Sequence, residues 1–177
     1  ETALDVGCGN GRHAELLAGV ADRVVGLDAS RALLQAATDR VGDSVALLQG
    51  DATRLPLAAG SVDLAVYVAT LHHLPSQSAR RASLDELARV LAPDARALVS
   101  VWSTAHDRFD ADPDADEGFD TTVDWTLPGG ETVPRFYHIY ASAEFERDVA
   151  DSALRLVSME LSSGNCYGVV EPEGKRT

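Results

Sequence analysis

Three glycines at alternate positions follow an apolar run near the start of the chain, in the segment LDVGCGNG at residues 4–11. Glycine lets a backbone turn sharply and approach a ligand that a β-carbon would block. A dinucleotide-binding loop has the spacing G-x-G-x-x-G, but here the third glycine comes one place early, at Gly11. Asp5 precedes the first glycine, where it would repel a pyrophosphate and attract a cation. The loop therefore favours a cofactor with a cationic amino-acid moiety over NAD or FAD.

Two further acids stand directly after apolar runs. Asp28 ends the segment VVGLD, and Asp51 follows Gly50 after the segment VALLQ. Open α/β sheets bind ligands at the carboxyl ends of their strands. Three such features in succession predict one binding site at one edge of a sheet.

Buried strands and amphipathic helices alternate along the chain and would position these groups. Apolar runs predict strands at 3–6, 24–27, 45–48, 64–68 and 97–101, with two short strands at 154–159 and 167–170. Residues at helical spacing predict two helices, one with Leu34, Ala37, Thr38 and Val41 and one with Leu84, Leu87, Ala88 and Leu91. Ser30 is the expected N-cap of the first. A further helix is expected at 143–152, with Ser142 as its N-cap. This alternation predicts an α/β fold with a parallel sheet.

The composition is that of one globular domain. The chain has 177 residues, 45% of them hydrophobic, and no apolar run long enough to span a membrane. Two cysteines give no framework of disulfides, which favours a cytoplasmic setting. Because the chain starts at Glu1 and enters a strand at once, we expect a fragment that lacks an N-terminal helix.

Acids strongly outnumber bases. There are 28 Asp and Glu residues against 15 Lys and Arg, for a net charge of −13. We hypothesise a halophilic source, because a carboxylate shell keeps a protein dispersed at high salt. Residues 103–124 are especially rich in aspartate and show no apolar period, so we expect an exposed insertion within the single domain 1–177.

The glycine loop and the two later acids resemble the motifs of class I S-adenosylmethionine (SAM)-dependent methyltransferases. The resemblance implies a Rossmann-like sheet, mostly parallel with an antiparallel C-terminal strand, and helices on both faces. It assigns the ribose hydroxyls to Asp28, and the adenine to the Asp51 carboxylate and the Ala52 backbone. The cofactor-binding residues it implies are Asp5, Gly7, Cys8, Gly9, Asn10, Gly11, Asp28, Ala29, Asp51, Ala52 and Ala69. The product would be S-adenosylhomocysteine.

The fourth predicted strand ends in the segment TLHHLP at residues 70–75, where class I enzymes meet their substrate. An Asn-Pro-Pro-Tyr type of motif is absent there, which disfavours methylation of an exocyclic base nitrogen. His72 and His73 are therefore candidate site residues. They are also candidates for plain packing under the next helix.

The later part of the chain resembles the Trm9 and ALKBH8 tRNA methyltransferases. The similarity lies in the segments RFYHIY at 135–140 and GNCYGVV at 164–170, with departures at Phe136, Cys166 and residues 93–95. This family methylates the carboxylate of 5-carboxymethyluridine at the wobble position of the tRNA anticodon loop. It commonly works with a small zinc-binding activator, Trm112, which we expect at the sheet edge formed by residues 45–48.

The resemblance implies roles for individual side chains. The candidate catalytic residues are Arg135, which would hold the substrate carboxylate through paired hydrogen bonds, and His138 and His72 as further donors. Tyr137 and Tyr167 would border the base, Asn165 would bond its edge, and His73 would bind substrate. Alternatively, Arg135 forms a surface ion pair and the two tyrosines pack in the core.

Two other functions stay open. A class I methyltransferase acting on a small-molecule oxygen or carbon suits the negative charge and the absence of a lysine-rich patch. A scaffold that binds SAM without chemistry is the third hypothesis. No metal site is expected in this chain, because Cys8 and Cys166 lack paired spacing.

Overall fold

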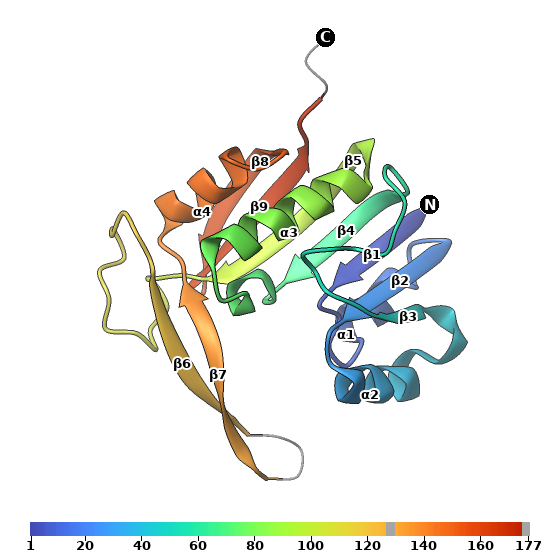
Figure 1. The fold of residues 1–177 in the computed structure, drawn as a ribbon, viewed down its shortest axis with the longest axis horizontal. Helices are drawn as coiled ribbons and strands as arrows, with labels where there is room; N and C mark the ends of the chain where they lie inside the picture. Colours follow the sequence, from blue (N-terminus) through green and yellow to red (C-terminus); the bar gives the residue numbers. More distant parts are fainter. Residues whose placement is uncertain (127–129, 175–177) are drawn as a thin grey trace.

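The computed structural model describes residues 1–126 and 130–174 (Figure 1). Within them, seven strands form the main sheet and two form a separate hairpin. The main sheet contains β1 (Thr2–Val6), β2 (Arg23–Asp28), β3 (Ala46–Gln49), β4 (Val62–Val68), β5 (Leu91–Trp102), β8 (Leu154–Ser162) and β9 (Asn165–Pro172). The hairpin consists of β6 (Phe119–Thr126) and β7 (Thr132–Ile139). The helices are α1 (Arg12–Leu17), α2 (Arg31–Val41), α3 (Gln77–Val90) and α4 (Ser142–Ala150), with short 3-10 turns η1 (Gly42–Ser44) and η2 (Leu71–His73).

The strand order of the main sheet is β3-β2-β1-β4-β5-β9-β8. Strands β1 to β5 pair in parallel, whereas β9 is antiparallel to both β5 and β8. This arrangement confirms the expected mostly parallel α/β sheet with an antiparallel C-terminal strand. The order reverses between β1 and β4, and such a reversal opens a crevice at the carboxyl ends of the strands.

Helices cover both faces of the sheet because alternate residues of each strand point to opposite sides. Leu4 and Val6 of β1 belong to a core cluster that includes Leu84 of α3 and Phe145 of α4. Ala3, the neighbour of Leu4, belongs to a second cluster with residues of α1 and α2. The sheet is therefore buried on both faces, which explains why its strands appear in the sequence as unbroken apolar runs.

Helix boundaries follow local capping chemistry. The Ser30 side chain accepts a hydrogen bond from the Leu33 N–H, so the predicted cap of α2 is confirmed. Two boundaries differ from prediction. Leu91 begins β5 instead of ending α3, and Ser142 is the first residue of α4, with Ala141 at the cap.

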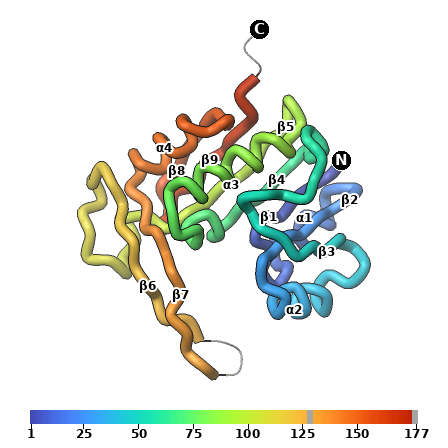
Figure 2. The backbone as a smooth tube through the Cα atoms, in the orientation of Figure 1, coloured from blue at the N-terminus to red at the C-terminus, as the bar shows by residue number. Residues whose placement is uncertain are grey.

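The β6–β7 hairpin projects beyond the main sheet, as the tube in Figure 2 shows. Residues 119–124, expected in an exposed insertion without regular structure, form most of β6. The frequent aspartates obscure a two-residue period in which Thr121, Val123 and Trp125 share one face. Val123 packs with Tyr137 and Ile139 of β7 in a small apolar cluster, and this packing stabilises the strand pair.

Among the described residues, no helix has the length and apolar character needed to cross a membrane.

Candidate active site

The glycine loop joins β1 to α1. It requires glycine because its backbone is left-handed at these positions and because a neighbouring side chain leaves no room for a β-carbon. Gly7 has a φ of 71° and Gly9 a φ of 55°, in the left-handed region that side chains disfavour. A β-carbon on Gly7 would lie 2.2 Å from the Thr70 side chain. The amide groups of Gly7 and Cys8 both donate to the Leu27 carbonyl, at 2.7 and 2.9 Å. These contacts fix the loop against the end of β2.

Asp28, the last residue of β2, has a carboxylate held by two backbone donors. The N–H of Gly9 donates to Oδ2 at 2.9 Å, and the N–H of Ser30 donates to Oδ1 at 2.7 Å. Each carboxylate oxygen has two lone pairs, so both oxygens retain acceptor capacity. Asp28 is thus positioned to accept hydrogen bonds from a pair of neighbouring hydroxyl groups.

Asp51 is oriented by the residue two places on. The Thr53 backbone N–H and hydroxyl both donate to Asp51 Oδ1, at 2.8 Å each. Asp51 and Ala52 follow β3, next to the end of β2 in the sheet.

A cavity of about 670 Å³ brings most of the expected site residues together. It lies at the carboxyl ends of β1, β2 and β4, where the strand order reverses. The expected residues that line it are Gly7, Cys8, Gly9, Asn10, Asp28, Ala29, Asp51, Ala52, Ala69, His72, His73, Arg135 and Tyr137. Ala69 adopts a φ of 52°, a strained backbone of the kind that clusters at functional sites.

Asp5 and Gly11, also expected to bind the cofactor, do not line this cavity. Asp5 is only 1% exposed, and its Oδ2 atom is buried without a hydrogen-bond partner among the described residues. Burial, reinforced by the nearby Asp28 charge, raises the pKa of Asp5 from 3.8 to about 7. A buried, incompletely bonded carboxyl group beside a glycine loop is the environment that a ligand's cationic amino group would complement. The donor and acceptor set therefore fits SAM.

His72 is buried at the substrate side of the cavity. Its Nδ1 atom accepts a hydrogen bond from the Trp102 backbone N–H at 3.0 Å, which places the neutral ring's proton on Nε2. Burial, together with the neighbouring His73 and Arg135, lowers the pKa of His72 to about 3. The ring is therefore neutral at physiological pH.

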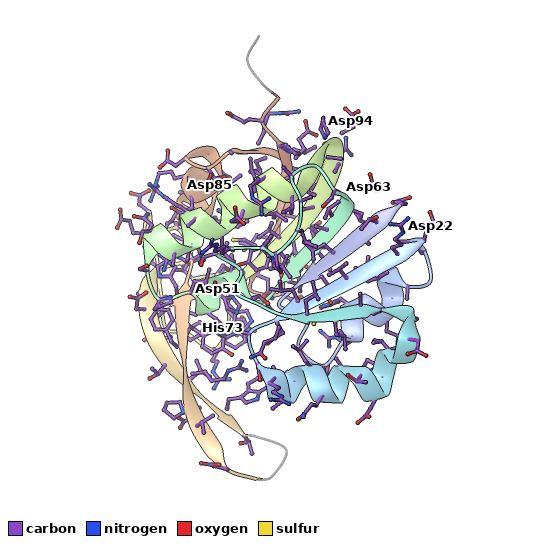
Figure 3. All side chains as sticks on the ribbon, turned by 45° about the vertical axis from the view of Figure 1, so that its right-hand side comes forward. Asp22, Asp51, Asp63, His73, Asp85 and Asp94 are labelled. Atoms are coloured by element: carbon purple, nitrogen blue, oxygen red, sulfur yellow. The ribbon has the colours of Figure 1, made fainter. Side chains whose placement is uncertain are left out.

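His73 lies between the hairpin and the sheet (Figure 3). Its Nδ1 atom is 3.0 Å from the Phe136 carbonyl oxygen of β7, and its ring centroid is 4.4 Å from that of Tyr137. Burial lowers its pKa. The contact fastens the turn after β4 to the hairpin.

The hairpin supplies the other wall of the cavity. Arg135 and Tyr137 lie on the same face of β7, and the guanidinium carbon of Arg135 is 5.1 Å from the centroid of the Trp125 ring. Trp125 and Trp102 also line the cavity, although sequence reasoning did not select them. Trp102 ends β5, and the rule that strand ends line the site would have identified it. No comparable signal identified Trp125, because strand β6, to which it belongs, was not predicted from the sequence.

One expected catalytic residue, His138, and two expected substrate-binding residues, Asn165 and Tyr167, lie elsewhere. His138 is on the opposite face of β7 from Arg135, because side chains alternate along a strand. Its two ring nitrogens bond Asp120 at 2.7 Å and Glu144 at 2.9 Å, so it joins the hairpin to α4 and does not reach the cavity. Asn165 bonds the Ser163 carbonyl, and Tyr167 lies within β9; neither lines the cavity.

Within the described residues, no group of three or more His, Cys, Asp or Glu side chains is placed to hold a metal ion.

The sheet order, the glycine loop and the acid that ends β2 define a Rossmann-like domain that binds a nucleoside-containing cofactor. Residues 4–99, more than half of the chain, match a family model described as a methyltransferase domain. The chain belongs to this family and is a class I SAM-dependent methyltransferase.

Several relatives are similar to this chain in sequence, and the names of two of them state different acceptors. A methyltransferase of Encephalitozoon cuniculi is 29% identical over 171 residues, which are 95% of this chain and 77% of the relative. A tRNA (carboxymethyluridine(34)-5-O)-methyltransferase of Arabidopsis thaliana is 36% identical over 100 residues, 56% of this chain and 24% of the relative. The 27-O-demethylrifamycin SV methyltransferase of Amycolatopsis mediterranei is 36% identical over 99 residues, 52% of this chain and 35% of the relative. The chain thus spans about a quarter to three quarters of the length of these three relatives.

Solved methyltransferase structures share the fold. DhpI in complex with S-adenosylhomocysteine has a TM-score of 0.74 at 21% identity, covering 99% of this chain and 78% of that one. A Haloferax volcanii protein in complex with the Trm112 methyltransferase activator has a TM-score of 0.72 at 17% identity, covering 98% and 83%.

Proposed function

We propose that this chain methylates the carboxylate of 5-carboxymethyluridine at the wobble position of tRNA. The observation that carries the proposal is the position of Arg135, which lies in the same cavity as the glycine loop, over the Trp125 ring and on the same face of β7 as Tyr137. A guanidinium group matches a carboxylate through two parallel hydrogen bonds. Aromatic rings next to that cation suit an anion carried on a planar base.

Bound SAM supplies an electrophilic methyl group on a sulfonium centre. The Asp28 carboxylate would accept hydrogen bonds from the ribose hydroxyls, and Asp51 with Ala52 would hold the adenine. Asp5, buried close to the glycine loop, would offset the charge of the amino group. The residues that would hold the cofactor and Arg135, which would hold the acceptor carboxylate, line one cavity or lie directly beside it.

The acceptor needs no general base. A carboxylate is ionised near neutral pH, so the residues around it have to align it and exclude water. His72 suits this chemistry, because it is neutral and its Nδ1 lone pair is already used by Trp102. The rings of Trp102, Tyr137 and Trp125 provide the apolar wall.

Relatives that carry the tRNA carboxymethyluridine methyltransferase name support this acceptor. The strand β3 is an edge of the main sheet, and Ala46 and Gln49 are exposed there. An edge strand has free backbone groups with which a second chain can pair. We infer that a Trm112-like activator binds at β3.

A small-molecule acceptor is the second candidate. The net charge of −13 favours it, since an acidic surface repels a polyanion at low ionic strength. The rifamycin methyltransferase among the relatives is consistent with it.

The test is methyl transfer from labelled SAM to unmethylated tRNA that carries 5-carboxymethyluridine, in the presence of a Trm112-type activator. Mass spectrometry of the nucleosides is expected to show the labelled methyl ester at the wobble position. If the label appears in a small-metabolite extract and not in tRNA, the second candidate replaces the first.

A further inference from the structure

His72 and His73 are adjacent in sequence, but their hydrogen bonds are of opposite kinds. His72 Nδ1 receives the Trp102 N–H. His73 Nδ1 faces the Phe136 carbonyl oxygen, which can only accept, so Nδ1 of His73 must carry the proton. The backbone thus holds the neutral His73 ring in the tautomer whose Nε2 lone pair is free.

That lone pair is available to a ligand. Among the described residues, Nε2 of His73 has no hydrogen-bond partner, and it is not one of the three side-chain atoms that are buried without one. The residue is half-buried and lines the cavity. Burial has the largest effect on the pKa of His73 and lowers it. The charge of Arg135 also lowers this pKa, and the charge of Asp28 raises it. His73 is therefore a neutral hydrogen-bond acceptor in the cavity that Arg135 also lines.

We propose that His73 Nε2 accepts a hydrogen bond from a ring N–H of the methyl acceptor and thereby determines which base is used. This inference rests on the proposed function and names the residue that recognises its base. A uracil ring carries an imide N–H at N3, whereas cytosine has a bare nitrogen acceptor at the same position. A bare nitrogen opposite the His73 lone pair would leave two acceptors facing each other, so the site selects uracil over cytosine.

The tautomer is tested without any activity. Long-range ¹H–¹⁵N spectra of the histidine-labelled protein are expected to show the proton of His73 on Nδ1 and that of His72 on Nε2. Assignments come from His73→Asn and His72→Asn. A proton on Nε2 of His73 overturns the inference.

Variants test the recognition step. Asparagine at position 73 can still donate an amide N–H toward the Phe136 carbonyl but has no acceptor at the Nε2 position. We expect His73→Asn to raise KM for the tRNA by roughly tenfold or more and to leave the affinity for S-adenosylhomocysteine within about twofold. His73→Gln, which retains a distal acceptor, should recover part of the loss. His106→Asn is the matched control, because His106 lies outside the cavity.

A substrate pair separates this inference from the proposed function. Anticodon stem-loops carry either 5-carboxymethyluridine or its N3-methylated form, which lacks the imide N–H. Methylation of the first alone supports both proposals. Equal methylation of the two overturns the role of His73 and keeps the proposed function, while methylation of neither overturns the proposed function and with it the inference.

Discussion

The rings of Trp102 and Tyr137 stack almost in parallel, with centroids 4.7 Å apart and planes 15° apart. Trp102 ends β5 of the main sheet, and Tyr137 belongs to β7 of the hairpin. On the other face of β7, His138 bonds Glu144 of α4. The hairpin is therefore fastened on both faces, and its cavity-facing side chains have a fixed position relative to the glycine loop.

Replacing Tyr137 by Leu removes the stack. We expect a loss of about 1–3 kcal/mol in the free energy of unfolding, because a buried aromatic pair contributes through area and ring geometry. Hydrogen exchange should show faster opening of the hairpin amides than of the β1 to β4 amides. Tyr137→Phe retains the ring and is the control; equal loss in both variants contradicts a role for stacking.

Replacing Arg135 by Ala removes the cation from the hairpin wall. We expect kcat/KM for the tRNA to fall by roughly tenfold or more and the affinity for S-adenosylhomocysteine to stay within about twofold. Steady-state kinetics and calorimetry measure the two quantities. Arg108→Ala, at an exposed position outside the cavity, is the control. An equal fall in cofactor affinity argues against substrate binding by Arg135.

Trp125→Ala tests the aromatic face beside Arg135. Trp125 is 46% exposed, so the free energy of unfolding should change by less than about 1 kcal/mol. The KM for the tRNA should rise by about threefold to tenfold, as expected for a lost base stack of roughly 1 kcal/mol. Trp125→Phe should retain most of the affinity. An unchanged KM in Trp125→Ala would exclude this ring from the substrate site.

Asp5→Asn tests the buried carboxyl group. Because its pKa is raised from 3.8 to about 7, the folded protein holds its proton through a range in which the unfolded chain has lost it. This group's contribution to stability therefore falls as the pH rises from about 4 to about 7. At pH 8 the variant should be more stable than the parent by about 1–3 kcal/mol and bind S-adenosylhomocysteine more weakly.

Urea unfolding across this pH range measures the difference between variant and parent. Asp39→Asn changes the same charge at an exposed position and is the control. A pH dependence that is identical in Asp5→Asn and in the parent would mean that Asp5 titrates normally.

His138→Asn separates a structural role from a catalytic one. The side chain bridges Asp120 and Glu144, so we expect the free energy of unfolding to fall by about 1–3 kcal/mol. At a temperature where the variant is fully folded, kcat should stay within about threefold of the parent value. A fall of several hundredfold without loss of stability would return His138 to the reaction.

The cavity residues that follow β1, β2 and β3 were predictable because their signals are local. Gly7 needs a left-handed backbone, and Asp28 and Asp51 each stand where an apolar strand ends, so short segments carry the information. The mostly parallel sheet could then be anticipated from alternating strands and helices.

The substrate side was not predictable in the same way. Arg135 and Tyr137 were expected at the site only through the family resemblance, and Trp125 was missed. Trp125 faces the cavity because β6 pairs with β7, and the aspartates of β6 conceal the period of that strand. The expected position of His138 differs from the observed one for a related reason. Neighbouring residues of β7 point to opposite faces, so Tyr137 faces the cavity and His138 faces Glu144. No sequence motif indicates which residues of β7 face the cavity.

The hairpin forms a two-stranded sheet of its own, outside the residues matched by the family model. Under the proposed function, the hairpin part of the acceptor site, with Trp125, Arg135 and Tyr137, is encoded outside the segment that carries the glycine loop and His73. Exchanging residues 119–139 for the corresponding hairpin of another enzyme should redirect the methyl group to a new recipient while leaving donor binding intact, which makes this segment a natural place for lineages to diversify.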